Sequence, residues 1–375
     1  MKLRALVSLL AALLLFGGEP ALARPQAEWR TARPETVGVD QAALAQLAAD
    51  VRAGRYSNIH SVLVVRRGRL VMEEYFAGED ERRGQPIGRV QFDAETLHDV
   101  RSVTKSVTSI LMGIAIAQGK IPGGVEAPAL DFFPEYADLR TPERQAIRLR
   151  HLLTMTAGLE WDEHSRPYSD PRNSEREMDA APDPVRYVLE RPIVAPPGAR
   201  FEYSGGNTAV LARIIERSVG KNLDAYAEEV LFRPLGIARH EWLTDQTGAP
   251  LAASGLRLRP RDMAKLGLLY LNDGRWRGRQ IVPQDWVRAS LSPHIVVSER
   301  PTGFQRYGYQ WWLGTARRGE ESVAWSCAVG WGGQRILLVP SEDMVVVITA
   351  GMYGDPRQTD LTFEIMLDRI LPAVR

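Results

Sequence analysis

The chain has 375 residues, of which 45% are hydrophobic and 25% are charged, and its formal net charge is +1. This composition predicts a globular protein with a large core and excludes a disordered chain. The balanced charge and the lack of long basic runs argue against nucleic acid as a partner. The single cysteine, Cys327, excludes a disulfide within the chain.

The first 23 residues have the pattern of a secretory signal peptide. Lys2 and Arg4 precede an apolar stretch over 5–16, and "ALA" at 21–23 provides a small-residue cleavage site. The apolar stretch is shorter than the roughly 20 residues that span a membrane, and no later run approaches that length. We therefore expect an exported protein, periplasmic or secreted, without stable membrane insertion once residues 1–23 are removed. An uncleaved anchor is the alternative.

The rest of the chain is expected to form a mobile lead-in over 24–36 and a single domain over 37–375. A β-hairpin is predicted over 61–76, where two β-branched runs flank a charged turn with Gly68. Apolar periodicity predicts helices over 102–118, 147–155, 208–219, 223–232, 261–272 and 283–291. Strands follow over 307–314, 335–340 and 344–351, before a final helix over 359–374. Strands at both ends predict an α+β fold with one sheet built from both termini and a largely helical lobe, about 102–291, between them.

Lys105 occupies an unusual position, three residues after Ser102 in the first turn of the predicted helix. The helix dipole disfavours a cation there, and the chain has only five lysines among its 47 basic residues. The helix is apolar nearly all round beyond Ile110, which predicts burial, and burial lowers the pKa of an amine. A neutral amine near a serine hydroxyl can take its proton and generate a nucleophile, which arginine cannot do.

The same spacing also arises without catalysis. A second Ser-x-x-Lys, from Ser218 to Lys221, lies at the end of a predicted helix, where Gly220 is expected as a C-cap and a cation is favoured. We interpret that copy as structural. Taken alone, Ser102 is equally well explained as an N-cap followed by an exposed lysine.

Four segments favour the catalytic interpretation. "SVTKS" at 102–106, "IRLRHLLTMTAGLEW" at 147–161, "FEYSGGN" at 201–207 and "GWGGQRILLVP" at 330–340 resemble the serine β-lactamase and penicillin-binding protein superfamily in order and spacing. The resemblance covers nearly the whole mature chain. It is to the branch that holds class C β-lactamases, DD-peptidases, family VIII esterases and 6-aminohexanoate-dimer hydrolase. It implies a β-lactamase/transpeptidase-like fold with an antiparallel sheet flanked by helices, and no cofactor.

The resemblance assigns catalytic roles to three residues. Ser102 matches the acylated nucleophile and Lys105 the first base. Tyr203 matches the tyrosine that serves as a general base or proton shuttle. A tyrosine hydroxyl beside a cationic lysine is expected to be easier to deprotonate than a free one.

The resemblance also assigns residues that face the substrate. The oxyanion hole is expected from the backbone N–H groups of Ser102 and Trp331. Gly330 is expected to let the substrate lie against its strand, where a side chain would block it, and Gly332 and Gly333 fit the same need. Trp331 is the aromatic residue expected to line the pocket.

Two positions depart from the family pattern. Gly205 stands where the second motif usually ends in asparagine, with the nearest asparagine at Asn207, and Ala328 stands where the third motif carries lysine or histidine. Both changes remove groups that help hold the amide and the carboxylate of a penicillin or a D-Ala-D-Ala tail. We therefore expect hydrolysis of a small ester, amide or peptide substrate through a Ser102 acyl-enzyme. The alternatives are a weak β-lactamase or DD-peptidase, and a non-catalytic module that binds penicillin or wall peptides.

No metal is expected. The six histidines form no His-Glu-x-x-His motif, and a lone cysteine cannot supply a zinc pair. The chain also lacks a Gly-x-Ser-x-Gly elbow and a P-loop. His151 is expected to order a turn or cap a helix.

Overall fold

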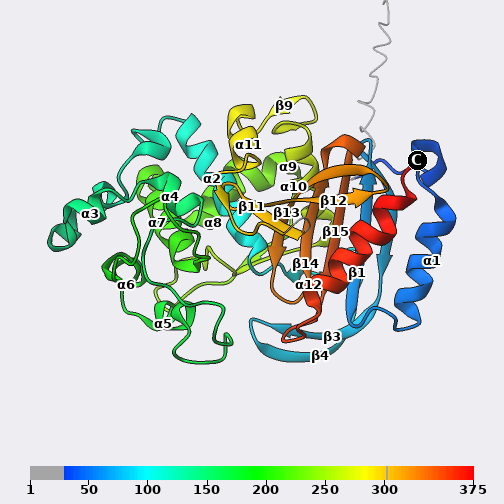
Figure 1. Cartoon of the computed structure of the whole chain (residues 1–375), viewed down its shortest axis with the longest axis horizontal. Helices are drawn as coiled ribbons and strands as arrows, with labels where there is room; N and C mark the ends of the chain where they lie inside the picture. The colour runs from blue at the N-terminus through cyan, green and yellow to red at the C-terminus, as the bar shows by residue number, and fades with distance from the viewer. Residues whose placement is uncertain (1–28, 301–302) are drawn as a thin grey trace, which may run out of the picture.

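A computed structural model describes residues 29–300 and 303–375 (Figure 1). The predicted signal peptide and residues 24–28 of the expected lead-in lie outside the described residues. Residues 29–36, also part of that expected lead-in, lie against the second strand of the main sheet. Trp29 is buried, and Leu70 exchanges backbone hydrogen bonds with Arg30 and Ala32, at 2.9 and 3.2 Å.

The main sheet is antiparallel and takes its strands from both ends of the chain. Its order is β10-β11-β12-β13-β14-β15-β1-β2. The bounds are β1 (Ile59–Arg66), β2 (Arg69–Tyr75), β10 (Ile295–Val296), β11 (Gly303–Tyr307), β12 (Trp312–Arg318), β13 (Glu321–Gly330), β14 (Gln334–Val339) and β15 (Met344–Ala350). β1 pairs with β15 from Ile59 opposite Ala350 to Arg66 opposite Met344. The predicted fold class is therefore confirmed.

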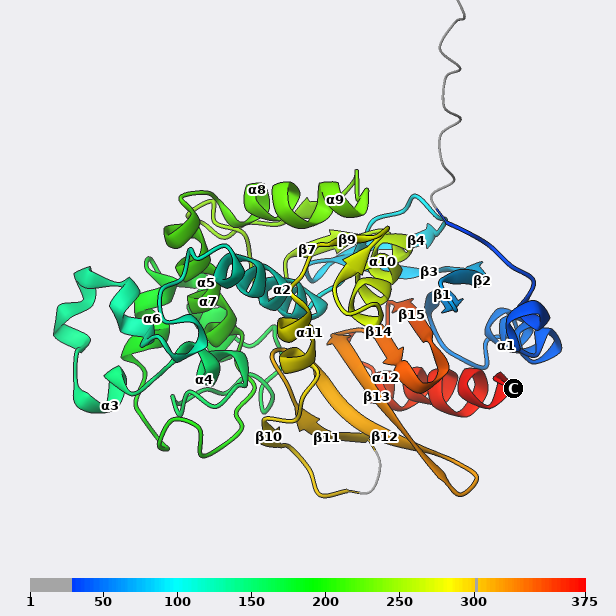
Figure 2. The ribbon, with the colours of Figure 1, turned by 90° about the horizontal axis from the view of Figure 1, so that it is seen from above.

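Side chains alternate between two hydrophobic cores, one on each face of this sheet. In β1, Leu63 and Val65 belong to one core, while Val62 and Val64 belong to the other, as the pleat requires. The second core is covered by α1 (Gln41–Arg52), α12 (Gln358–Phe363) and the π-helical η7 (Glu364–Ile370), and Figure 2 shows α1 beside the C-terminal helices. The first core is covered by α2 (Val103–Ala117) and α10 (Pro260–Leu271) and continues into the helical lobe.

The helical lobe lies between β4 and β10 in the sequence and packs around α2. Its helices are η2 (Gly124–Glu126), η3 (Ala129–Phe132), η4 (Pro134–Leu139), α3 (Pro142–Gln145), α4 (Leu149–Leu153), α5 (Ser174–Ala180), α6 (Pro184–Glu190), α7 (Gly205–Val219), α8 (Leu223–Ala227), η5 (Glu228–Phe232), α9 (Arg233–Leu235) and α11 (Gln284–Ser290). The remaining elements are η1 (Pro34–Val37), η6 (Pro340–Glu342), η8 (Leu371–Ala373), β3 (Ala77–Arg82), β4 (Gln85–Gln91), β5 (His98–Asp99), β6 (Glu241–Trp242), β7 (Leu256–Leu258), β8 (Arg275–Trp276) and β9 (Arg279–Gln280). Among the described residues, no helix is both long and apolar enough for a membrane span.

The strand predicted over 307–314 is wrong, because the chain turns in its middle. β11 ends at Tyr307 and β12 begins at Trp312, and the N–H of Gly308 donates to the carbonyl of Trp311 at 2.8 Å. Gln310 has a left-handed φ of 64° and is buried. Its backbone carbonyl accepts a hydrogen bond from Ser106 of α2 at 2.6 Å, so the turn ties the sheet to the central helix.

Helix α2 depends on a glycine for its close packing. A Cβ added at Gly113 would overlap the ring of Trp286 in α11. We expect Gly113→Val to lower the free energy of unfolding by about 1–3 kcal/mol, the usual range for overpacking. The measurement is urea unfolding, with Ala117→Val at an exposed position of the same helix as the control for β-branching. Equal midpoints for the two variants would contradict the packing argument.

Candidate active site

Ser102 and Lys105 meet at the start of α2. The Nζ atom of Lys105 donates a hydrogen bond to Ser102 Oγ at 3.0 Å and a second to the carbonyl of Ala253 at 3.1 Å. The Lys105 side chain is 1% exposed. Ser102 precedes the first residue of the helix, but its side chain caps no backbone N–H. The hydroxyl therefore faces the lysine, as the nucleophile interpretation expects, and does not act as an N-cap.

The residue before Ser102 is held in a strained backbone conformation. Arg101 has a φ of 50°, in the left-handed region that residues with a Cβ rarely adopt. Its guanidinium forms an ion pair with Glu81 of β3 and lies 5.0 Å from the centre of the Tyr353 ring. These contacts stabilise the sharp turn that presents Ser102 at the end of the helix.

Tyr203 lies just before α7 and beside the other two residues. Lys105 Nζ is 4.8 Å from the centre of its ring. The ring stacks on His164 and Trp312, at centroid distances of 5.1 and 5.6 Å. Burial, with the nearby Glu163 carboxyl, raises the pKa of Tyr203 well above its usual value. The expectation that this hydroxyl loses its proton easily is therefore wrong, and Tyr203 is a neutral donor that can relay protons.

Two carboxyl groups in this cluster were not predicted. Glu163 and Glu175 are buried beside Lys105, and Glu163 Oε1 lies 3.8 Å from Lys105 Nζ. Glu163 comes from the loop after α4, and Glu175 lies in the first turn of α5. No motif marks either residue, because the contact is made between segments far apart in the sequence.

The two predicted oxyanion donors have no protein partner in the described part of the chain. Among the described residues, the backbone N–H groups of Ser102 and Trp331 have no hydrogen-bond acceptor. The three glycines around Trp331 meet steric needs of the backbone: a Cβ at Gly330 would overlap the carbonyl oxygen of Val100, just before the nucleophile. Gly332 and Gly333 have φ angles of 83° and 102°, and the N–H of Gly332 donates to Gln358 Oε1 at 2.6 Å.

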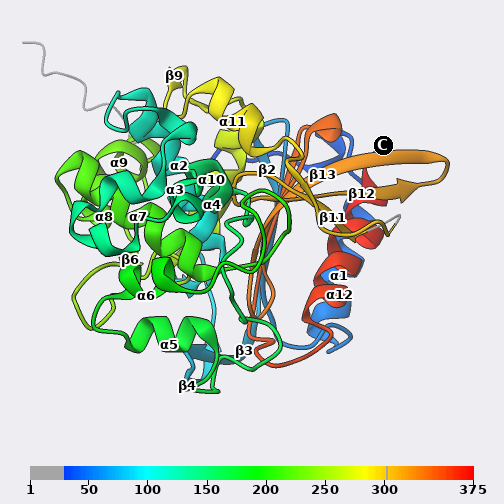
Figure 3. The same ribbon diagram turned by 60° about the vertical axis from the view of Figure 1, so that its left-hand side comes forward.

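A cavity of about 500 Å³ opens at Ser102, between the helical lobe and the β3–β4 hairpin. Figure 3 shows α5 beside that hairpin, and Arg83 of the hairpin turn forms an ion pair with Asp179 of α5 at 2.7 Å. The wall carries Trp331, which is 37% exposed and lies edge-on to Tyr168 at 5.6 Å. The lining also includes Glu81, Arg83, Gln85, Arg101, Glu175, Arg176, Ser254 and Tyr353.

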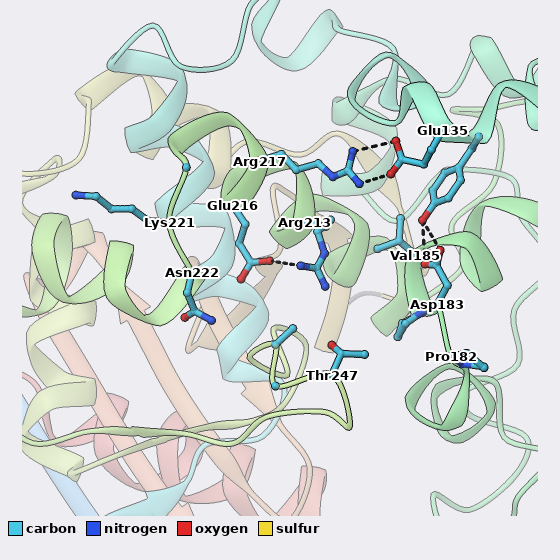
Figure 4. Close-up of a pocket in the computed structure, with 15 residues that line it drawn as sticks. Glu135, Pro182, Asp183, Val185, Arg213, Glu216, Arg217, Lys221, Asn222 and Thr247 are labelled. Atoms are coloured by element: carbon cyan, nitrogen blue, oxygen red, sulfur yellow. Dashed lines mark hydrogen bonds and ion pairs between the residues drawn. The ribbon is translucent and has the colours of Figure 1, made fainter.

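A second cavity, of about 650 Å³, lies in the helical lobe and contains none of the predicted site residues. Figure 4 shows that ion pairs and hydrogen bonds occupy its walls. Arg217 pairs with Glu135, and the Tyr136 hydroxyl donates to Asp183 at 2.7 Å. Because these side chains pair with one another, they form no reactive cluster in this cavity.

One group of potential metal ligands occurs in the described part of the chain, formed by His60, Asp80 and His98. His60 Nδ1 lies 2.8 Å from His98 Nε2, a hydrogen-bond distance. Two nitrogen ligands of tetrahedral zinc would be about 3.3 Å apart for bonds of about 2.0–2.1 Å. Burial and the His98 ring lower the pKa of His60 to about 2, so its ring is neutral. We therefore interpret the two histidines as a hydrogen-bonded pair that joins β1 to β5, and not as part of a metal site.

Three other residues singled out in the sequence have structural surroundings. Ala328 is buried in the core next to α2. Cys327 is buried, and burial raises the pKa of its thiol to about 12, so it stays protonated. His151 accepts a hydrogen bond from the N–H of Arg148 at 3.1 Å, which confirms that it caps a helix, here α4.

Comparison with known proteins agrees with this geometry. The family model named Beta-lactamase matches residues 44–367. A 6-aminohexanoate-dimer hydrolase of Paenarthrobacter ureafaciens is 27% identical over 322 residues, covering 81% of this chain and 76% of the relative. Esterase EstB of Burkholderia gladioli is 25% identical over 183 residues, covering 47% and 44%. The structure of EstCE1, a hydrolase with promiscuous acyltransferase activity, matches with a TM-score of 0.65 at 19% identity, covering 86% of this chain and 99% of that one. The chain therefore belongs to the beta-lactamase family and is a serine hydrolase of the superfamily that includes β-lactamases and penicillin-binding proteins.

Proposed function

We propose that the protein is an exported serine hydrolase that cleaves an ester or amide bond of a small substrate through an acyl-enzyme on Ser102. The hydrogen bond of 3.0 Å between Lys105 Nζ and Ser102 Oγ, at the mouth of a cavity of about 500 Å³, carries this proposal. A lysine base next to a serine hydroxyl is the arrangement that nucleophilic catalysis requires.

The reaction proceeds in two steps. Ser102 Oγ attacks the substrate carbonyl carbon while its proton passes to Lys105, and the N–H groups of Ser102 and Trp331 stabilise the oxyanion. The bond to the leaving group breaks, and the leaving group takes a proton relayed through Tyr203. Water then attacks the acyl-enzyme, which releases the acid and restores the Ser102 hydroxyl.

The charges around the cavity favour a substrate that needs no carboxylate. Ala328 contributes no cation from its strand position. Of the three arginines that line the cavity, Arg101 and Arg83 pair with Glu81 and Asp179, and Arg176 is exposed on α5. The names of the relatives, an esterase and a 6-aminohexanoate-dimer hydrolase, support an ester or amide as the scissile bond.

The signal-like sequence of residues 1–23 supports export. Expression of the full chain in a Gram-negative host, followed by cell fractionation, tests this part. The expected product is a periplasmic or secreted protein whose N-terminus is Arg24. A product that retains Met1 in the cytoplasm would contradict it.

A substrate panel tests the activity. We expect the mature protein to hydrolyse p-nitrophenyl butyrate with a kcat/KM at least about tenfold above that for a chromogenic cephalosporin, because Ala328 supplies no cation at the strand position where the family binds the carboxylate. A fluorophosphonate should add one mass label, located at Ser102 by peptide mapping. Faster turnover of the cephalosporin would favour a β-lactamase, and labelling without turnover would favour a binding module.

A further inference from the structure

The two carboxyl groups beside Lys105 meet at Gly205. Glu163 Oε2 accepts a hydrogen bond from the Gly205 N–H at 2.6 Å, and Glu175 Oε2 lies 3.1 Å from the point that a Cβ on Gly205 would occupy. Both residues are buried, with the Glu163 side chain fully inaccessible. Two neighbouring buried carboxylates each disfavour the ionised form of the other, so one of them is expected to keep a proton and the pair to carry a single negative charge.

Neighbouring donors hold the pair in place. Glu163 Oε2 accepts hydrogen bonds from the N–H of Gly205 at 2.6 Å and from the indole of Trp161 at 2.9 Å. Glu163 Oε1 accepts one from the Tyr168 hydroxyl at 2.9 Å. Ser254 donates to Glu175 Oε1 at 2.9 Å. Because these four donors come from three separate segments, the carboxyl positions are set by the fold as a whole.

The pair also explains the glycine at position 205. A Cβ added at Gly205 would lie 3.1 Å from Glu175 Oε2 and 3.3 Å from the Cβ of Ala253, which is tighter than ordinary contact. The space that a larger side chain would need is taken by the Glu175 carboxyl. Gly205, which stands where the second motif usually ends in asparagine, therefore leaves room for the buried carboxyl pair.

We propose that Glu163 and Glu175 share one proton and act together as positioning residues that anchor the Lys105 amine beside Ser102 and set how readily it accepts the Ser102 proton. This inference rests on the proposed hydrolase function. Glu163 Oε1 is 3.8 Å from Lys105 Nζ, close enough for charge in the pair to act on the amine through a buried, poorly screened environment.

The electrostatics of the cluster agree with one shared proton at neutral pH. Burial and the charge of Glu175 raise the pKa of Glu163 to about 8. Burial alone would raise the pKa of Glu175, but the Lys105 charge and the neighbouring Glu163 carboxyl lower it. The pair therefore holds one proton at neutral pH and loses it as the pH rises through about 8.

The titratable side chains packed around the pair also have shifted pKa values. Burial raises the pKa values of Tyr168, Tyr203 and Tyr307 well above their usual value, so these hydroxyls remain neutral. Burial, with the Lys105 charge, lowers the pKa of His164, which keeps that ring neutral at pH 7 and above. On α5, burial and the Glu175 charge raise the pKa of Asp179 to about 6, and Arg83 and Arg176 stand near it. The three tyrosines, His164 and Asp179 therefore do not titrate near pH 8.

The sign of the effect on catalysis follows from the charge of the pair. Below about pH 8 one negative charge faces Lys105, and above it two do. The second charge stabilises the ammonium form, so it opposes transfer of the Ser102 proton to the lysine. The rate of acylation should therefore level off or fall as the pH rises through about 8 in the wild type.

The test is the pH profile of p-nitrophenyl butyrate hydrolysis by Glu163→Gln, with Glu160→Gln as the matched control. A glutamine amide can donate to Glu175 as the protonated Glu163 does, but it cannot ionise. We expect the ratio of kcat/KM for Glu163→Gln to that of the wild type to rise at least about fivefold between pH 7 and pH 9, since one pH unit beyond a pKa changes the ionised ratio tenfold. KM should change less than about twofold, and Glu160→Gln, exposed in the same loop, should follow the wild type.

Parallel profiles for Glu163→Gln and the wild type would overturn the proposal. If Glu163→Gln does not fold, Glu175→Gln removes the same shared proton and carries the same expectation.

Thermal unfolding provides a readout that needs no activity. A carboxyl whose folded pKa is raised keeps a proton that the unfolded chain loses above the ordinary glutamate pKa of 4.5, so its contribution to stability decreases as the pH rises toward 8. The Tm of the wild type minus that of Glu163→Gln should therefore fall between pH 5 and pH 8, and a constant difference would overturn the shared proton. A wild type without hydrolysis would refute the hydrolase function but leave this measurement decisive for the pair.

Discussion

Ser102→Ala is expected to lower kcat/KM for p-nitrophenyl butyrate by on the order of 10⁴-fold or more, because no acyl-enzyme can form without the nucleophile. The structure indicates that this substitution would remove catalytic activity without unfolding the protein. Ser102 is partly exposed at the cavity and caps no backbone group, so removing its hydroxyl breaks no capping hydrogen bond. Release of nitrophenolate at pH 7 measures the effect, and circular dichroism checks that the variant is folded.

The chain supplies its own control for this experiment. Ser218 and Lys221 repeat the Ser-x-x-Lys spacing, but they lie at the far end of α7, where Gly220 forms the C-cap. Ser218→Ala should leave hydrolysis within about twofold of the wild type, since that position does not line the cavity at Ser102. Equal activity in Ser102→Ala and the wild type would remove the acyl-enzyme from the proposed function.

Lys105→Arg is expected to reduce kcat/KM by about 10²- to 10⁴-fold, the range that one general base supplies. Arginine keeps the positive charge beside Glu163 but does not release its proton at any accessible pH, so it cannot accept the Ser102 proton. The larger guanidinium must also fit where the lysine side chain is 1% exposed. Steady-state kinetics with p-nitrophenyl butyrate measure the loss, which we expect mainly in kcat.

Lys221→Arg is the matched control, because Lys221 is an exposed lysine that pairs with Glu229 on the surface. Lys221→Arg should have the same kcat/KM for p-nitrophenyl butyrate as the wild type. If Lys105→Arg retained more than about a tenth of the activity, the lysine would act as a fixed positive charge and not as a base.

The sequence predicts those features of this protein that depend on local spacing. Apolar periodicity is local, so it located α2 and α10 to within one residue at each end. The pairing of Ser102 with Lys105 is local too, because three residues along a helix bring two side chains to the same face. The β-branched runs at both ends of the chain predict strands there, which is enough to predict one sheet built from both termini.

Features that depend on contacts across the fold could not be predicted in the same way. Glu163 and Glu175 lie in segments without strong periodicity, and their meeting with Lys105 exists only once α2, α5 and the loop after α4 are packed. The direction of the Tyr203 pKa shift failed for a related reason. Proximity to Lys105 was predicted, but the opposing effects of burial and Glu163 were not visible in the sequence.

The single strand predicted over 307–314 is wrong for another reason, which the turn at Gln310 shows. The aromatic residues around it have high β-propensity, which favoured one long strand. The backbone hydrogen bonds of Gln310, however, go to Ser106 of α2 and Leu153 of α4, and these tertiary contacts override the local preference.

The pairing of β1 with β15 has a consequence for how the protein is made. Ile59 faces Ala350 across the sheet, so the first strand of the domain finds its neighbour only after almost the entire chain has left the ribosome. Until then the β1 edge of the β1–β2 hairpin, which β15 covers in the folded protein, is unpaired, and the apolar side chains on one face of the hairpin lack the covering helix α12. Closing so long a loop makes the last step of folding slow and dependent on the complete chain. A polypeptide of this design stays open during synthesis and acquires its nucleophile pocket only as its C-terminal strand arrives.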